Sequence, residues 1–167
     1  VNNRQVLAVL SDHGARVDAK KHHVTFTAEI IARAVKLAPT AFRLHDVLGN
    51  ETHHFSGHAV YFTPGSAALN VLDYQTKKIR RPCTKDYVDH AKLVSRLPYI
   101  ASQSTALIPA DVPTAISDSY RLYLSLLYCE KPVVTGAFSV EAFEVMKDLQ
   151  LAVRGTEAAL REKPLTI

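Results

Sequence analysis

Three apolar segments that open with proline decide the fold: PYIASQSTALI at residues 98–108, PVVTGAF at residues 132–138 and PLTI at residues 164–167. Ile100, Val133 and Leu165 hold corresponding places in them and are separated by 33 and 32 residues. A strand–helix repeat of this size is the unit of a parallel α/β fold, and a regular repeat is typical of a barrel. The sequence therefore predicts successive parallel strands joined by helices.

Helical periodicity fills the intervals between these segments. Thr84 and Ser139 are suitable N-caps because a hydroxyl oxygen can accept a hydrogen bond from a free helix amide. A third helix follows Pro113, Gly155 ends the helix that Ser139 opens, and a short helix is expected at residues 156–162. We expect the apolar residues of the three longer helices to face inward: Tyr87, Val88, Ala91, Val94, Leu97, Ile116, Tyr120, Tyr123, Leu124, Leu127, Ala142, Phe143, Met146, Leu149 and Val153.

The first 82 residues lack this repeat and predict short mixed elements. A helix should end at Gly14, a hairpin should turn near Lys20, and a helix capped by Thr27 should end before Pro39. Further strands are expected at residues 42–44, 59–62, 69–72 and 74–79, with the Pro-Gly pair at 64–65 forming a turn between two of them.

These patterns divide the chain into an N-terminal mixed α/β segment with hairpins, residues 1–82, and the first β/α units of a TIM-type barrel, residues 83–167. A parallel strand at the end of a chain would leave an unpaired edge. We therefore expect the N-terminal part of a (β/α)8 barrel, truncated after roughly two or three of its eight strands.

Composition excludes several classes of protein. Hydrophobic residues make up 47% of the chain and the net charge is only +4, which suits a folded domain and argues against a nucleic-acid binder. The densest basic run, residues 77–81, is expected to be a solvated turn or strand edge, and a polyanion site is the alternative. Cys83 and Cys129 are isolated, which indicates a reducing, cytoplasmic location. No apolar stretch approaches the ~18 residues that span a bilayer, so no membrane partner is expected.

Adjacent histidines raise the possibility of a zinc site. His22 and His23 are neighbours, as are His53 and His54, and His58 follows four residues after the second pair. Adjacent side chains on a strand point to opposite faces, so such a pair rarely binds one ion. We predict no metal site in this chain.

The order of several short motifs resembles the trimethylamine methyltransferase (MttB) family of corrinoid-dependent methylamine and betaine methyltransferases. The motifs cover nearly the whole chain and are residues 11–18, 38–44, 71–74, 80–84, 97–98, 108–113 and 131–138. The resemblance implies a (β/α)8 barrel that transfers a methyl group from a small methylated amine, such as trimethylamine or a betaine, to a corrinoid protein. The corrinoid (cobalamin) would then be carried by that partner and not bound by this chain, and a homo-oligomer is possible.

Candidate binding residues can be predicted from the expected barrel, because the active site of such a barrel lies at the carboxyl ends of its strands. Thr135, Gly136 and Phe138 follow the second predicted strand, and Asp111 stands between the first strand and its helix. Asp111 could face a cationic substrate or could cap the following helix. Aromatic faces attract quaternary ammonium groups, so Tyr61 and Phe62 join Phe138 as candidate walls of the substrate site, with core packing as their alternative role.

Two other functions remain open at this point. A barrel supports many chemistries, so a different enzyme could use the same strand ends. A non-catalytic module that binds a small cationic ligand is the second alternative. The catalytic residues themselves are not identified by these patterns.

Overall fold

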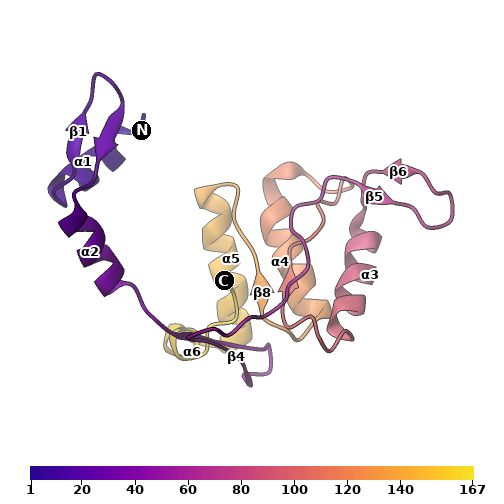
Figure 1. The fold of residues 1–167 in the computed structure, drawn as a ribbon. Helices are drawn as coiled ribbons and strands as arrows, with labels where there is room; N and C mark the ends of the chain where they lie inside the picture. The colour runs from indigo at the N-terminus through magenta and orange to yellow at the C-terminus, as the bar shows by residue number, and fades with distance from the viewer. The chain divides into compact units, whose positions relative to one another are not determined.

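Two units make up the structure, a computed structural model that describes residues 1–167: Val1–Thr40 and Ala41–Ile167 (Figure 1). Helices and short strands alternate in both, so the α/β class expected from the sequence is confirmed. The boundary predicted at residues 82 and 83 follows the strand–helix repeat, lies inside the second unit and stays a prediction. None of the helices combines the length and the apolar character needed to span a bilayer.

The first unit contains α1 (Arg4–Asp12), the antiparallel hairpin β1 (Arg16–Asp18) and β2 (His23–Thr25), and α2 (Ala28–Leu37). Gly14 ends α1 with a φ of +92°, a conformation that glycine adopts without steric cost. The Thr27 hydroxyl accepts a hydrogen bond from the Ile30 amide and caps α2. The helix, hairpin and capped helix predicted for this region are confirmed.

Two further hairpins open the second unit. One pairs β3 (Phe42–His45) with β4 (Glu51–Phe55), and the other pairs β5 (Val71–Leu72) with β6 (Ile79–Arg80). The strand predicted at residues 42–44 is confirmed, whereas β4 was not expected.

The predicted pairing of residues 59–62 with 69–72 across a Pro-Gly turn is wrong. Residues 59–67 form no strand, and the Ala67 and Ala68 amides donate to the carbonyls of Thr105 and Ala106. Ala68 forms a parallel bridge with Leu107. The backbone groups of this segment find their partners in another strand, which is why no local hairpin forms.

The parallel segments expected from the repeat lie side by side. β7 (Gln103–Ser104) pairs in parallel with β8 (Val133–Val134), and Val133 forms a parallel bridge with Thr166. The four extended segments near residues 68, 103, 133 and 166 are therefore neighbours in chain order. The strands are much shorter than the apolar runs suggested, and residues 1–167 do not close a barrel.

Helices connect and cover these strands: α3 (Thr84–Ser95), the 3₁₀ turn η1 (Thr114–Ile116), α4 (Ser117–Tyr128), α5 (Val140–Arg154) and α6 (Glu157–Glu162). The core lies between α4, β8 and α5, where Leu122, Val133 and Met146 pack together. The Ser139 cap is confirmed, since its hydroxyl accepts from the Ala142 amide. Gly155 ends α5 with a φ of +84°.

Two details of these helices correct the sequence-based expectations. The N-cap of α3 is Cys83, one residue before the expected Thr84, because Asp86 accepts a hydrogen bond from the Cys83 amide. Five residues expected to face inward are exposed instead: Leu97 after α3, Ile116 in η1, Tyr123 and Leu127 on α4, and Phe143 on α5. The buried face of α4 includes Asp118 and Arg121, which pair with each other.

Candidate functional site

The carboxyl ends of β7 and β8 meet at one edge of the parallel array, hereafter the carboxyl edge. Thr105 follows β7, Thr135 follows β8, and their hydroxyl oxygens lie 3.3 Å apart. Thr105 is buried, whereas Gly136 is exposed, with no atom within 4 Å of where a Cβ would stand. This is the place where an α/β protein of parallel strands presents polar groups to a ligand.

A buried ion pair braces this edge from α4. Arg121 Nη2 lies 2.8 Å from Asp118 Oδ1, and only 1% and 5% of the two side chains are exposed. Arg121 Nη1 donates to the Thr105 carbonyl at 2.9 Å, and Nε donates to the Ser117 carbonyl at 3.2 Å. The guanidinium thus ties the end of β7 to the first turn of α4, with all three of its nitrogens hydrogen-bonded.

The same pair holds Phe138 in the loop after β8. The Phe138 amide donates a hydrogen bond to Asp118 Oδ2. Arg121 Cζ lies 5.0 Å from the centroid of the Phe138 ring, within the range of a cation–π contact. Phe138 is 63% exposed. Arg121 therefore contacts one face of the ring, while much of the remaining surface is accessible to a ligand.

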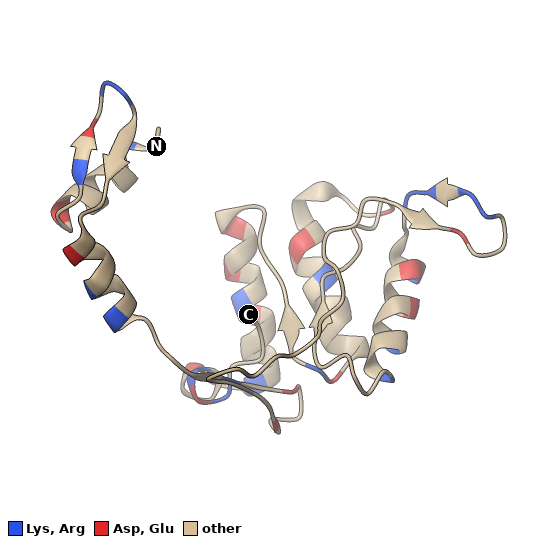
Figure 2. Cartoon of the chain, viewed as in Figure 1, with Lys and Arg blue, Asp and Glu red and all other residues tan.

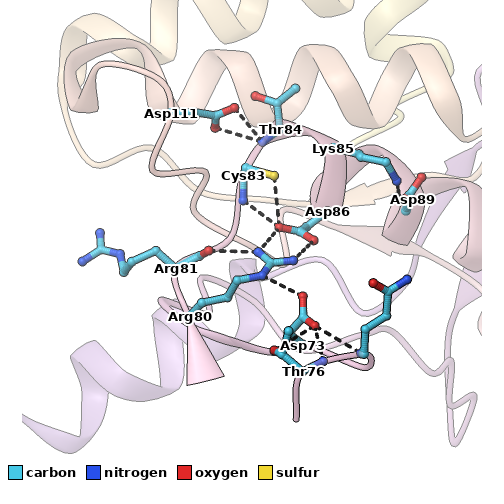
Figure 3. A network of polar contacts seen from close by, with 11 residues as sticks. Asp73, Thr76, Arg80, Arg81, Cys83, Thr84, Lys85, Asp86, Asp89 and Asp111 are labelled. Atoms are coloured by element: carbon cyan, nitrogen blue, oxygen red, sulfur yellow. Dashed lines mark hydrogen bonds and ion pairs between the residues drawn. The ribbon is translucent and has the colours of Figure 1, made fainter. Parts of the chain in front are cut away.

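Asp111 lies in the loop after β7, as expected, but its hydrogen bonds lead to a different helix. Both of its carboxylate oxygens accept from the Thr84 amide, at 2.9 and 3.1 Å (Figure 3). Asp111 therefore places a negative charge at the N-terminus of α3, where free amides and the helix dipole favour it. The predicted capping of the following helix is replaced by capping of the preceding one.

A network of charged side chains surrounds the start of α3 (Figure 3). Arg80 donates to Asp73 at 2.9 Å and, with two nitrogens, to Asp86 at 2.7 and 2.8 Å. Asp86 also accepts from the Cys83 amide at 2.8 Å and from its thiol at 3.2 Å. The network fastens the β5–β6 hairpin to the first turn of α3.

Hydrogen bonds to the charged forms shift the pKa values in this network. The Thr76 amide and the Arg80 side chain lower the pKa of Asp73 to about 2. The Arg80 guanidinium lowers the pKa of Asp86, and the two carboxylates raise the pKa of Arg80. All three groups are thus charged at neutral pH.

A cleft of about 740 Å³ separates the hairpin from α3. Its walls carry both charged and apolar side chains, including His90, whose buried Nδ1 has no hydrogen-bond partner. Burial lowers the pKa of His90, which favours the neutral ring. The residues that line the cleft are Val71, Leu72, Asp73, Tyr74, Gln75, Arg80, Cys83, Lys85, Asp86, Asp89, His90, Leu93 and Leu107.

Tyr61 and Phe62 lie near the opposite, amino end of the parallel strands. The Phe62 carbonyl accepts from the Ala101 amide, two residues before β7 begins. The Tyr61 hydroxyl bonds the backbone of His54, and its ring lies against the buried ring of His53. The structure therefore does not bring these two aromatic residues together with Thr135, Gly136 and Phe138.

Sequence reasoning missed Asp118 and Arg121, because α4 was interpreted by its apolar residues alone; Asp118 lies in its first turn and Arg121 three residues further on. Their separation of three positions, which places two side chains on one helix face, is the signal that could have identified them. No group of three or more His, Cys, Asp or Glu side chains is arranged to hold a metal ion.

Comparisons with known proteins cover nearly the whole chain. The family model described as trimethylamine methyltransferase (MTTB) matches residues 1–167. The chain is also similar to "Trimethylamine methyltransferase MttB" of Desulfitobacterium hafniense (strain DSM 10664 / DCB-2), with 22% identity over 165 residues. That alignment covers 99% of this chain and 33% of the relative, so the chain spans about a third of the length of that protein.

Proposed function

The chain belongs to the trimethylamine methyltransferase (MTTB) family, and we propose that it is the first part of a (β/α)8 barrel enzyme that moves a methyl group from a methylated amine to a corrinoid protein. The whole-chain match to the family is the observation that carries the proposal. Trimethylamine and betaines are the proposed substrate class, and the corrinoid belongs to the acceptor protein.

The order of the parallel segments supports a barrel. Neighbours in space are neighbours in sequence at each parallel junction: Ala68 with Leu107, β7 with β8, and Val133 with Thr166. A doubly wound sheet would reverse its strand order at a switch point, whereas a barrel adds each strand beside the previous one. A helix lies between each of the three successive pairs of segments.

The chemistry required is a transfer of one carbon between two nucleophiles. The corrinoid would supply the electron pair for the new bond to the methyl carbon from its reduced cobalt, and the pair of the broken C–N bond would leave with the amine. This chain's residues would hold the amine so that its methyl group points at the acceptor, and would exclude water from the reacting atoms.

We assign the amine to the carboxyl edge. The exposed face of Phe138 offers an aromatic surface to a cation, and Gly136 leaves room for close approach of a ligand. The Thr135 hydroxyl and the Asp111 carboxylate are the polar groups that we assign to this site. Tyr61 and Phe62 lack such a position and are left out of it.

A thermal-shift screen of the full-length protein with trimethylamine, glycine betaine, carnitine and proline betaine tests the substrate class. A ligand that binds only the folded state must raise the melting temperature. We expect one of the four to do so, and to support methyl transfer to a cobalt(I) corrinoid. Phe138→Leu should weaken the shift, while Phe143→Leu, an exposed aromatic change on α5, should not.

Absence of transfer with all four amines, in the presence of the reduced corrinoid protein, would count against the proposed reaction.

We also propose a cytoplasmic location, which is supported by the free thiols of Cys83 and Cys129.

A further inference from the structure

The β5–β6 hairpin displays large apolar side chains to solvent. Leu72 is 68% exposed, Ile79 is 74% exposed, and Tyr74, at the turn, is 84% exposed. Figure 1 shows the hairpin projecting beyond α3. Contiguous exposed apolar surface of this kind marks an interaction site more often than it serves the fold.

The hairpin is also basic. Figure 2 shows lysine and arginine along β6 and the part of the turn that leads into it, whereas β5 carries none. Arg80 is occupied by two carboxylates, but Lys77, Lys78 and Arg81 form no ion pair. Lys77 Nζ lies 3.9 Å above the centroid of the Tyr74 ring, so the cation and the aromatic side chain form one surface. The charge left over on this surface is positive.

Internal hydrogen bonds make the hairpin rigid. Asp73 Oδ1 accepts from the amides of Gln75 and Thr76, and the Asp73 amide donates to the Lys78 carbonyl. Arg80 then fixes the hairpin to Asp86 on α3. A surface that is ordered before it binds loses little conformational entropy on binding, which favours affinity.

The position of the hairpin connects it with the proposed reaction. It joins the segment that ends near Ala68 to the start of α3, and the Pro82 carbonyl there accepts from the Ala110 amide in the loop after β7. Thr84, two residues on, is held by Asp111 from the same loop. The base of the hairpin therefore lies at the carboxyl edge, where a methyl acceptor has to approach.

We propose that the β5–β6 hairpin is the docking arm for the methyl-accepting protein, and that it binds a surface on which carboxylates surround an apolar patch. This inference rests on the proposed function. Charge complementarity identifies the carboxylates, and the exposed Leu72, Tyr74 and Ile79 identify the apolar patch. The large apolar share of the surface favours a protein over a nucleic acid, which is bound mainly through phosphate contacts.

The first unit contains a matched control. Asp18 Oδ1 accepts from the amides of Lys20 and Lys21, both at 3.1 Å, in the same way that Asp73 organises its turn. His22 has a positive φ four residues after Asp18, as Lys77 has after Asp73. The β1–β2 hairpin carries the lysine pair but no exposed large apolar side chain, so it separates the effect of charge at a turn from the effect of docking.

The test uses the full-length protein with two acceptors: the purified corrinoid protein and free cobalamin, both reduced to cobalt(I). For Lys77→Glu/Lys78→Glu, the ratio of kcat/KM for the protein acceptor to kcat/KM for free cobalamin should fall about tenfold or more through a higher KM. Tyr74→Ser should lower the same ratio. Lys20→Glu/Lys21→Glu should leave it unchanged.

Each other outcome overturns the inference in a recognisable way. If the unmodified protein methylates neither acceptor, the proposed function fails, and the arm fails with it. If it methylates both and the hairpin variants keep the normal ratio, only the arm fails. An unchanged ratio with an altered sedimentation coefficient, or with loss of salt-sensitive DNA retention, would assign the hairpin to contacts between copies or to nucleic acid instead.

Discussion

Two clusters of aspartate and arginine lie at the carboxyl edge, and they differ in their exposure to water. The Asp118–Arg121 pair is almost completely buried, while 41% of the Arg80 side chain is exposed where it bridges Asp73 and Asp86. Both arginines use several nitrogens, and both also donate to a backbone carbonyl. The same types of side chain therefore have different roles in the two clusters, and the difference follows from their exposure to water.

The buried pair orders the edge, whereas the exposed cluster orders an appendage. Water cannot replace Arg121 as a partner for Asp118, so loss of the arginine would leave a charge in an apolar environment. Water can replace Arg80, and the side chains there gain little from pairing at the surface. We expect the buried cluster to affect the stability of the whole unit, and the exposed one to affect only the hairpin.

The largest effect is expected for Arg121→Ala, because it leaves the buried Asp118 carboxylate without a counter-charge and with only the Phe138 amide as a partner. Removal of one member of a buried pair costs about 3–5 kcal/mol of unfolding free energy. Urea denaturation of residues 1–167 measures this loss. Arg161→Ala is the matched control, since the Arg161 side chain is 84% exposed and its nitrogen lies as far as 3.8 Å from the Glu157 carboxylate. Equal losses in the two variants would remove the distinction between the clusters.

The second effect is local. Arg80→Ala should release the β5–β6 hairpin, so the Asp73 and Lys77 amides, which now bond within it, should lose their protection from hydrogen exchange. The urea midpoint should hardly move. The β1–β2 hairpin, which has no such arginine, provides the reference for exchange in an unanchored hairpin. Retained protection in the variant would mean that the Asp73 turn alone holds the hairpin.

The sequence predicts the architecture better than the site. Repeating proline, apolar run and helix signals act over short distances, so they located β8, α5 and the Thr27 and Ser139 caps. The partner of the segment near Ala68 is Leu107, far along the chain, and only the folded chain reveals that pairing. Local turn chemistry therefore suggested a hairpin that does not form.

The candidate site shows the same limit. Thr135, Gly136 and Phe138 were found because they follow a strand directly, and that rule needs no tertiary information. Arg121 was missed because its partners, the Thr105 carbonyl and the Phe138 ring, come from two other segments. The spacing of Asp118 and Arg121 could have indicated that the two pair, but not that the pair holds the end of β7 and the loop after β8.

A third effect, smaller than those of Arg121→Ala and Arg80→Ala, is expected on acidification. The pKa of Asp73 is about 2, below its ordinary value of 3.8, so its bonds stabilise the hairpin fully above pH 3.8. As the pH falls towards 2, protonation should remove that contribution and the hairpin should open. Exchange or NMR shifts of the Lys77 amide report this. Asp73→Asn keeps an oxygen that accepts from the turn amides but has no carboxylate to titrate, so it should abolish the transition. An unaltered transition in that variant would assign it to another carboxylate.

The smallest effect on stability is expected for the Lys85–Asp89 ion pair, although its two atoms lie closest together. Lys85 Nζ lies 2.5 Å from Asp89 Oδ2, closer than Arg121 lies to Asp118, yet 81% and 58% of the two side chains are exposed. Two flexible side chains in water lose conformational entropy when they pair, and salt screens their attraction. Asp89→Asn should therefore leave the urea midpoint within error of the unmodified chain, and high salt should remove any residual difference. A loss approaching that of Arg121→Ala would show that pair distance, and not burial, governs the stability of both clusters.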